Sequence, residues 1–304
     1  MVIKISIIGI GRVGSTLAYT LLLRGLTDEL VLVDQNINVA EGEVLDLEHA
    51  EAFTSCPVIV RAGRLDETAG SNIIVLCSSV PWNQQYKSRF DIGRDNLEIF
   101  EEIVPKLAKA SPQAKILVIT NPVDVMTYHA IRLSGFGAKR VFGTGTLIDS
   151  ARFRTMLSKK MQIHPDDLRA YILGEHGDSQ FPVFSSAVAG GTKIVEDDAT
   201  MDIFQKTTRA GFDVVSRKGH TSYAISMAAT LAIEAMVWDT HRTMPLSVLV
   251  DGFLGIRDVC LSLPVVLGKD GITQVLEPDF GQQEKDAFVR CAKIVRDAIK
   301  LSKS

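Results

Sequence analysis

Short apolar runs and longer amphipathic segments alternate through the first half of the chain. Runs rich in Val, Ile and Leu are typical of strands buried on both faces, and the longer segments between them indicate helices. The predicted strands are residues 3–8, 30–33, 58–61, 73–76, 115–119 and 141–142, and the predicted helices are 15–24, 39–50 and 91–109. Six strands separated by helices predict an α/β fold with a doubly wound parallel sheet of the Rossmann type.

The pattern changes after Gly145. Residues 146–160 predict a helix, and long helices follow with short strand candidates at 170–173 and 183–188. We therefore expect a Rossmann domain over residues 1–145 and a C-terminal α+β domain over 146–304. The two should pack as a rigid pair, because no low-complexity linker separates them. Pro105 lies inside the long helix at 91–109 and predicts a kink or a break there.

Composition narrows the class of protein. The 304 residues are 46% hydrophobic and 23% charged, as in globular proteins, and the net charge of −3 with no basic run gives no indication of nucleic-acid binding. The apolar runs are too short to span a membrane, and the first strand starts too early for a signal peptide. The cysteines, without C-x-x-C spacing, indicate free thiols in a reducing compartment and no metal site. We expect a cytoplasmic protein.

The first predicted strand leads directly into Gly9-Ile10-Gly11-Arg12-Val13-Gly14 and then into a helix. Strand, G-x-G-x-x-G and helix in this order form the context of a dinucleotide fingerprint. Gly9 allows the tight turn, Gly11 lets a pyrophosphate approach the backbone, and Gly14 permits close packing of helix on strand. The second strand ends at Asp34, where a carboxylate binds an adenosine ribose and repels a 2′-phosphate. The pattern favours NAD over NADP.

One histidine in the second half has surroundings that suit proton transfer. His176 lies in Gly174-Glu175-His176-Gly177-Asp178-Ser179, where glycines let the backbone bend and the ring face a cavity. Asp149 and Arg152 precede it, three residues apart on one face of a predicted helix. A carboxylate beside an imidazole fixes its tautomer and supports its charge, and a guanidinium nearby suits a substrate carboxylate. These side chains predict acid–base chemistry on a small acid.

Taken together, these segments resemble the lactate/malate dehydrogenase family over nearly the whole chain. The matching segments are residues 9–14, Asp34, Ser88-Arg89, Asn96, Asn121-Pro122-Val123-Asp124, Asp149-Ser150-Ala151-Arg152, residues 174–178 and Lys218-Gly219-His220-Thr221-Ser222. The resemblance implies an NAD-dependent oxidoreductase that moves a hydride reversibly between the cofactor and carbon 2 of a 2-hydroxy acid.

The same resemblance implies a role for each matching position. The catalytic residues would be His176, Asp149 and Arg89, a loop arginine that closes over the substrate and polarises its carbonyl. The substrate-binding residues would be Arg152, Asn121, Asn83 and Thr221. The cofactor-binding residues would be Gly9, Gly11, Arg12, Val13, Gly14, Asp34, Ser78, Asn96, Thr120 and Asn121.

The loop at residues 78–89 is expected to decide which keto acid is used. Asn83 stands where lactate dehydrogenases place Gln and malate dehydrogenases place Arg. Asn cannot form an ion pair with the second carboxylate of oxaloacetate, and it leaves more room than Gln for a larger keto acid. Lys87 could restore tolerance for a dicarboxylate, and Gln84 could take the Gln position if the loop register shifts.

Thr221 matches the lactate-type position, so we expect an L-lactate dehydrogenase that reduces pyruvate. Malate dehydrogenase and a broad-specificity L-2-hydroxyisocaproate-type dehydrogenase are the alternatives, and residues 143–147, 177–181 and 221–223 resemble the latter. A dinucleotide sensor without turnover is a further alternative, because fold alone does not fix function. Such a sensor would not need the intact catalytic set.

The resemblance also implies a homo-oligomer, either a tetramer or a dimer. Arg154 and Arg169 match positions where some bacterial lactate dehydrogenases bind fructose 1,6-bisphosphate between subunits, although the second is usually His. Paired guanidinium groups suit a phosphate, which would allow a sugar bisphosphate effector at these positions. The sequence alone favours the other interpretation, in which both arginines are solvated surface charges.

Overall fold

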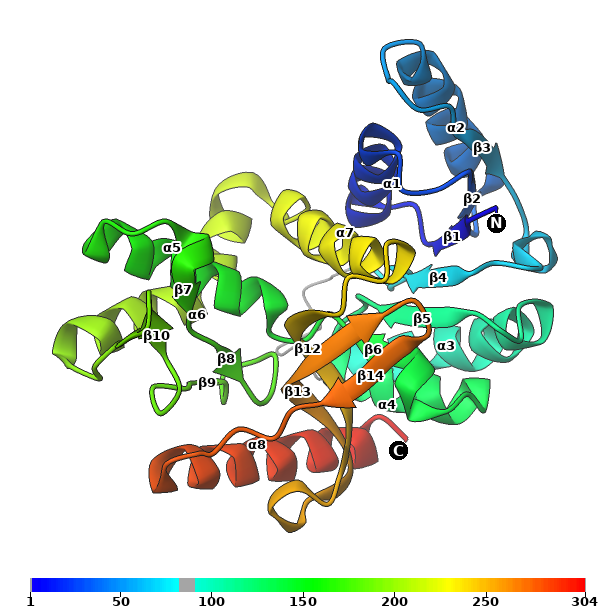
Figure 1. The fold of residues 1–304 in the computed structure, drawn as a ribbon. Coiled ribbons are helices and arrows are strands. Elements are labelled where there is room, and N and C mark those ends of the chain that lie inside the picture. Colours follow the sequence, from blue (N-terminus) through cyan, green and yellow to red (C-terminus); the bar gives the residue numbers. More distant parts are fainter. Residues whose placement is uncertain (1, 82–90, 304) are drawn as a thin grey trace.

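A nine-stranded sheet runs through the computed structural model, which describes residues 2–81 and 91–303 (Figure 1). Six of its strands are parallel and come from the first half of the chain, in the spatial order β3-β2-β1-β4-β5-β6. They are β1 (Lys4–Ile8), β2 (Glu29–Val33), β3 (Ile59–Ala62), β4 (Ile73–Leu76), β5 (Lys115–Val118) and β6 (Val141–Gly143). The order reverses between β1 and β4, as in a doubly wound sheet, so the predicted fold class is confirmed.

Helices connect these strands and cover the sheet. They are α1 (Arg12–Arg24), α2 (Ile37–Glu51), α3 (Asp91–Ala110) and α4 (Val123–Ser134). Helix α3 continues through Pro105 without a break, contrary to one of the two outcomes expected there. Pro105 has no backbone N–H, so the carbonyl of Glu101 lacks its hydrogen-bond donor in the helix. Pro105 lies on the exposed side of α3, where water can hydrate that carbonyl.

Three antiparallel strands from the second half extend the same sheet beyond β6. They are β12 (Arg242–Asp251), β13 (Arg257–Gly268) and β14 (Gly271–Val275), and β12 meets β6 where Ser247 pairs with Gly143. The expectation of only short strands after Gly145 was therefore wrong. Pro245 and Pro264 lie opposite each other in β12 and β13, and proline argues against a central strand when the sequence is read alone.

The rest of the second half forms a smaller core around α5 (Leu147–Met161) and also adds helices α7 (Tyr223–Val237) and α8 (Gln282–Leu301) to the main core. It also contains helix α6 (Asp198–Lys218). Its short strands are β7 (Leu168–Arg169), β8 (Ile172–Leu173), β9 (Phe181–Pro182), β10 (Val188–Ala189) and β11 (Thr192–Lys193). The strand predicted at 183–188 was wrong, because Phe184 and Ala187 are buried in the smaller core from a segment outside the sheets. The short 3-10 turns are Leu65–Thr68, Ala138–Arg140, Pro165–Asp167 and Phe253–Gly255.

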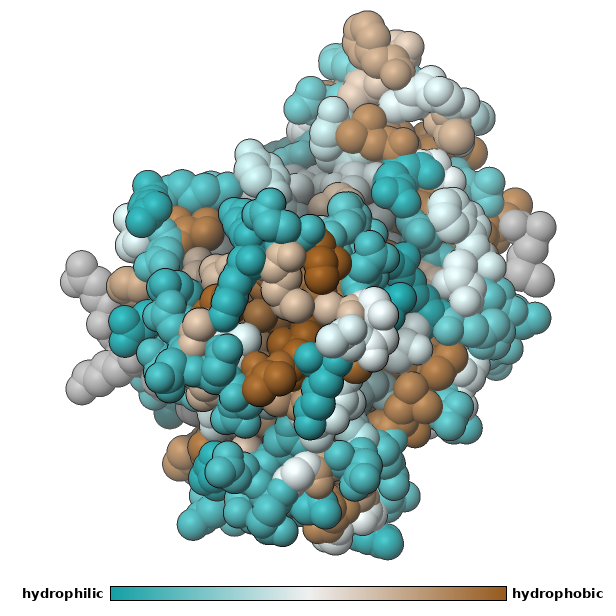
Figure 2. Space-filling model, turned by 60° about the vertical axis from the view of Figure 1, so that its left-hand side comes forward, coloured by the Kyte–Doolittle hydropathy of each residue, from teal (hydrophilic) through white to brown (hydrophobic). Residues whose placement is uncertain are grey.

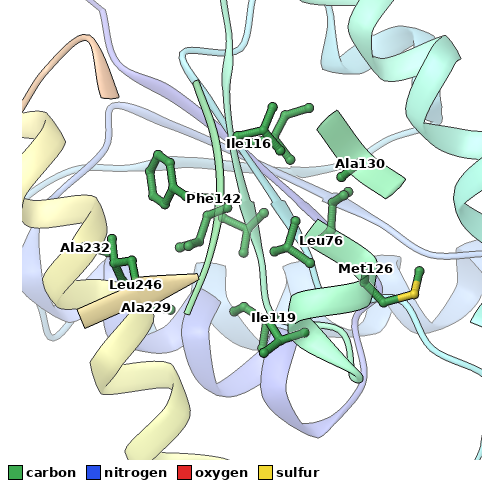
Figure 3. Packing of buried hydrophobic residues seen from close by; sticks show 14 of the residues in the cluster. Leu76, Ile116, Ile119, Met126, Ala130, Phe142, Ala229, Ala232 and Leu246 are labelled. Carbon is green, nitrogen blue, oxygen red and sulfur yellow. The ribbon is translucent and has the colours of Figure 1, made fainter. Parts of the chain in front are cut away.

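The main hydrophobic core contains residues from both halves of the chain (Figure 3). Leu76, Ile116 and Phe142 come from the parallel strands, whereas Ala232 of α7 and Leu246 of β12 come from beyond Gly145. The division into residues 1–145 and 146–304 stays a prediction, but the two parts share one sheet and one core. No helix among the described residues is long and apolar enough to cross a membrane.

Candidate active site

The loop that carries His176 is fixed to the long antiparallel strands. Gly174 has φ of +89° and exchanges two backbone hydrogen bonds with Ser262 of β13, at 3.2 and 2.8 Å. A Cβ at Gly174 would lie 2.6 Å from Sγ of Cys291 in α8. Glycine is therefore required both by the positive φ and by the close approach of α8. The turn that leads into His176 is set by contacts distant in the sequence.

Helix α5 is fixed against β8 at the end that carries Asp149. The hydroxyls of Thr146 and Ser150 donate to the carbonyl of Ile172, at 2.6 and 3.1 Å, and the Ile172 N–H donates back to Ser150 Oγ at 2.9 Å. Because β8 runs directly into the loop at Gly174, these bonds place the first turn of α5 beside His176.

His176 and Asp149 lie in direct contact, as the sequence predicted. Nδ1 of His176 is 2.6 Å from Oδ2 of Asp149, whose side chain is almost completely buried. A carboxylate at Nδ1 holds the proton on that nitrogen in the neutral ring, which leaves Nε2 as the proton acceptor. The arrangement can therefore pass a proton through Nε2.

Arg152 completes the group on the same face of α5. Its Nη1 lies 3.2 Å from Oδ1 of Asp149, and the side chain is partly buried. The guanidinium packs beside Gly211 of α6, where an added Cβ would lie 3.4 Å from Nη1. A planar cation held in this way, beside an acid–base histidine, suits the carboxylate of a small acid.

A second carboxylate holds the His176 backbone. The N–H of His176 donates to Oδ2 of Asp124 at 2.7 Å, and the Ser247 hydroxyl donates to Oδ1 at 2.5 Å. Burial raises the pKa of Asp124 to about 7, and the two hydrogen bonds act in the opposite direction. Sequence reasoning quoted Asp124 within a motif without giving it a role. It missed Ser247 altogether, although a serine inside the apolar run of β12 is a signal for a buried polar contact.

The glycine-rich loop has the shape that a pyrophosphate needs. Gly9 has φ of +94°, and a Cβ there would lie 2.5 Å from the backbone N of Ser78, while one at Gly14 would lie 2.2 Å from the Gly9 carbonyl oxygen. A Cβ at Gly11 would have no heavy atom within 4 Å. The buried hydroxyl of Ser78 has no hydrogen-bond partner among the described residues. This open loop at the start of α1, with a buried polar atom unsatisfied beside it, fits a bound dinucleotide.

Asp34 holds the same loop from the end of β2. Its carboxylate accepts hydrogen bonds from the backbone N of Ile10 at 2.8 Å and of Asn36 at 3.0 Å. Arg12, at the start of α1, donates from Nη1 to Nδ1 of His220 at 2.7 Å. A cavity of about 430 Å³ lies between the loop and the start of α7 and is lined by Gly11, Arg12 and His220. Asp34 and Arg12 thus lie around the predicted cofactor site.

Two other predicted cofactor residues, Asn96 and Thr120, fix the backbone near the carboxyl ends of β4 and β5. Asn96 is fully buried, and its amide accepts from the N–H of Val80 at 2.8 Å and donates to the carbonyl of Asn121 at 2.7 Å. Thr120 donates to the carbonyl of Ser78 at 2.8 Å. The side chains of Asn96 and Thr120 therefore position Ser78 and Asn121. Asn121 itself is exposed at the end of β5.

The structure gives fewer details for the remaining predicted site residues. Val13 lies in α1, and its carbonyl accepts from Ser226 of α7 at 3.1 Å. Thr221 is partly buried directly before the Ser222 cap of α7. Arg89 and Asn83, with Lys87 and Gln84, lie outside the described residues.

The two arginines of the expected effector site belong to a basic cluster. Burial lowers the pKa of Arg154, and the positive charges of Arg169 and Arg242 add to this effect, while Tyr171 and Asp166 oppose it. Arg169 is exposed and donates to the carbonyl of Asp166 at 2.9 Å. Arg242, at the start of β12, was not found by sequence reasoning, because its strand was not predicted.

The cysteines are all free, as expected from their spacing. Burial raises the pKa of Cys77 to about 12 and that of Cys291 to about 11, so both are thiols at neutral pH. Across residues 2–81 and 91–303, no group of three or more His, Cys, Asp and Glu side chains is arranged to hold a metal ion.

Comparison with known proteins agrees with this geometry. The family model described as lactate/malate dehydrogenase, NAD binding domain, matches residues 3–143, and the one described as lactate/malate dehydrogenase, alpha/beta C-terminal domain, matches residues 146–304. The chain is 38% identical to an L-lactate dehydrogenase of Gloeobacter violaceus, with 98% of this chain and 92% of that protein covered. It is 39% identical to one of Thermoanaerobacter pseudethanolicus, with 97% and 98% covered.

Solved structures show the same similarity. A lactate dehydrogenase enzyme from a Medee basin deep-sea metagenome library superimposes with a TM-score of 0.95 at 32% identity, and each chain is covered completely. The minor L-lactate dehydrogenase of Enterococcus mundtii superimposes with a TM-score of 0.95 at 30% identity, with 99% of this chain and 98% of that chain covered. With both family models matched and the His176–Asp149 pair formed, this chain belongs to the lactate/malate dehydrogenase family.

Proposed function

We propose that this protein is an NAD-dependent L-lactate dehydrogenase that interconverts pyruvate and L-lactate. The observation that carries the proposal is the group formed by His176, Asp149 and Arg152, in which a proton-transferring ring lies next to a cation suited to a carboxylate. The relatives named above are L-lactate dehydrogenases and agree with this substrate class.

The cofactor is held by the glycine-rich loop. Gly9, Gly11 and Gly14 let its pyrophosphate approach the N-terminus of α1, whose backbone N–H groups and partial positive charge suit phosphates. Asp34 faces the same loop and binds the adenosine ribose, which selects NAD over NADP. When bound, the nicotinamide donates or accepts the hydride.

His176 moves the proton. In the reductive direction, the protonated ring donates from Nε2 to the carbonyl oxygen of the keto acid, and in the oxidative direction the neutral ring accepts the hydroxyl proton there. Asp149 fixes the ring orientation through Nδ1 and stabilises the positive charge of the protonated form. The proton thus enters and leaves at one defined atom.

Arg152 binds and orients the substrate carboxylate through two parallel N–H donors. Asn121 and Arg89 polarise the reacting carbonyl, which acquires negative charge as the hydride arrives. The position of Asn121 at the end of β5 is consistent with this role, and that of Arg89 rests on the sequence alone.

The choice of pyruvate rests on Asn83 and Thr221. Neither side chain is a cation, so a second substrate carboxylate has no ion-pair partner at these positions. The experiment is to measure initial rates with NADH against pyruvate, oxaloacetate and 2-oxoisocaproate. A preference for pyruvate supports the proposal, a preference for oxaloacetate replaces it by malate dehydrogenase, and a preference for 2-oxoisocaproate replaces it by a broad-specificity enzyme.

We further propose a symmetric homo-oligomer, a tetramer or a dimer, in the cytoplasm. The side of the molecule on which α5, α6 and α7 lie shows apolar side chains gathered in a hollow, with hydrophilic residues around them (Figure 2). Tyr223 and Met227 of α7 are 71% and 50% exposed, which is a high exposure for side chains of this size. A second copy of the chain is the occupant we propose, and sedimentation of the purified protein tests it.

A sugar bisphosphate effector is proposed at Arg154 and Arg169, to which Arg242 adds a third guanidinium. Like charges gathered around the partly buried Arg154 favour an anion that would neutralise them. The binding of such an effector would couple this cluster to the active site through α5, which carries Arg154 five residues after Asp149 and two residues after Arg152.

A further inference from the structure

Asp124 is a buried carboxyl group that the mechanism above does not use. It lies in the first turn of α4, is 3% exposed, and accepts one hydrogen bond on each oxygen, from the His176 backbone and from the Ser247 hydroxyl. Burying a carboxyl group destabilises the folded protein unless hydrogen-bond donors satisfy its oxygens. Asp124 therefore joins three elements that are distant in the sequence, namely α4, the His176 loop and β12.

The surroundings of Asp124 act on its ionisation in opposite directions. Burial favours the neutral acid, and the negative charge of Glu175 acts in the same direction. The hydrogen bonds from Ser247 and His176, together with the positive charge of protonated His176, favour the carboxylate. The other ionisable neighbours are the buried thiols of Cys260 and Cys291. The pKa of about 7 places both forms of Asp124 in the range where the enzyme would work.

We propose that Asp124 and Ser247 form a buried positioning pair that holds His176 by its backbone and favours the protonated ring, alongside Asp149. The pair acts through His176 and has no contact with the reacting atoms. Two carboxylates then act on one imidazole, with Asp149 at Nδ1 and Asp124 from the backbone side. Only the kinetic test of this role rests on the proposed function.

Substitution by the isosteric amide separates the charge of Asp124 from its hydrogen bonds. In Asp124→Asn, the amide oxygen accepts from the His176 N–H and the amide nitrogen donates to Ser247 Oγ, so the loop keeps its position while the negative charge is lost. Ser247→Ala removes one donor to the carboxylate, which disfavours the ionised form. Both changes should make His176 lose its proton at lower pH. Asp297→Asn, at an exposed position of α8, is the matched control.

The test is NMR titration of the histidine rings in the free protein, without cofactor or substrate, with the His176 signal assigned from its loss in His176→Asn. We expect the midpoint for His176 to move to lower pH in Asp124→Asn, to move less in the same direction in Ser247→Ala, and to stay in Asp297→Asn. An unchanged midpoint in Asp124→Asn overturns the proposal. An unchanged midpoint in Ser247→Ala removes Ser247 from the pair, even if Asp124→Asn does not fold.

Kinetics provide the second readout. If loss of the charge lowers the midpoint by one pH unit, kcat/KM for pyruvate in Asp124→Asn falls about tenfold at pH values well above the wild-type midpoint and is unchanged well below both midpoints. A merely structural role would instead lower kcat/KM equally at both pH values, which would contradict the proposal. If the wild type reduces no 2-keto acid, the proposed function fails, while the titration still tests the positioning pair.

Discussion

Oδ2 of Asp149 lies 2.6 Å from Nδ1 of His176, so the imidazole is held through Nδ1. This contact joins the first turn of α5 to the loop after β8. We therefore expect Nε2 to be the atom through which the protein exchanges its proton, and the ring cannot flip without breaking a charge-assisted hydrogen bond. The predictions below begin from this ring.

His176→Asn is expected to leave NADH binding nearly intact and to lower kcat by about 10²–10⁴-fold, because only proton transfer is lost. Fluorescence titration with NADH and steady-state rates with pyruvate measure the two effects. His164→Asn, which replaces a histidine that is 70% exposed, is the matched control. A variant that kept more than about a tenth of the wild-type rate would show that His176 is not the acid–base group.

Asp34 should set the choice of cofactor. The wild type is expected to use NADPH poorly, and Asp34→Ser should narrow the difference, because the carboxylate that repels the 2′-phosphate is removed. The KM for NADH should rise at the same time, since Asp34 also holds the backbone N–H groups of Ile10 and Asn36. Comparison of kcat/KM for NADH and NADPH in both proteins tests this. Equal efficiency in the wild type would refute it.

Asn83 should decide between monocarboxylic and dicarboxylic keto acids. The wild type is expected to reduce pyruvate better than oxaloacetate, and Asn83→Arg should reverse the order. A charged hydrogen bond contributes about 1.5–3 kcal/mol, which corresponds to roughly 10- to 100-fold in rate. The measurement is kcat/KM for both substrates in both proteins. If Lys87 already supplies the cation, the wild type will reduce oxaloacetate well and the substitution will change little.

Fructose 1,6-bisphosphate should lower the pyruvate concentration needed for half-saturation. The basic cluster around Arg154 would bind its phosphates, and Arg242→Gln or Arg169→Gln should weaken the response while leaving the rate at saturating pyruvate unchanged. Arg217→Gln, on α6, is a control outside this cluster. Saturation curves with and without the sugar bisphosphate provide the test. An unchanged wild-type curve would end the regulatory proposal.

His129 should make the fold sensitive to acid. It is 3% exposed in α4, contacts Ser302 Oγ through Nε2 at 2.9 Å, and burial lowers its pKa to about 4. The unfolded chain therefore binds a proton first as the pH falls, and the stability contributed by neutral His129 is lost between about pH 6.5 and pH 4. The full difference is about 3 kcal/mol.

Urea unfolding of the wild type and His129→Gln at one protein concentration measures this effect. The wild type should lose more free energy of unfolding than the variant as the pH falls through this window. Parallel losses in the two proteins would show that His129 does not titrate as proposed.

Local patterns in the sequence were sufficient to predict the parallel sheet. The strand, the glycine-rich turn and the helix occur within one short segment, and the structure shows a close approach that requires glycine at Gly9 and at Gly14. The contact between His176 and Asp149 was also predicted, although from a family resemblance and not from local geometry. The roles of these side chains stay predictions until the variants are measured.

The parts that were not predicted depend on long-range pairing. Strands β12 and β13 were not predicted because they contain Pro245 and Pro264. Proline has no backbone N–H to donate to a neighbouring strand, so its presence in a sequence argues against a central strand. Ser247 could not be placed next to Asp124 without knowing that β12 pairs with β6. Tertiary packing overrides the local signal at these positions.

The pairing of β6 with β12 affects the order in which the parts of the protein can fold during synthesis. Ser247 meets Gly143 only after about a hundred further residues have left the ribosome, and β13, which fixes Gly174, follows still later. Until then the nascent chain has an unpaired sheet edge at β6, and the His176 loop lacks the contacts that β12 and β13 provide. The nucleotide-binding half can thus form during translation, whereas the catalytic loop acquires its geometry only once nearly the whole polypeptide is available.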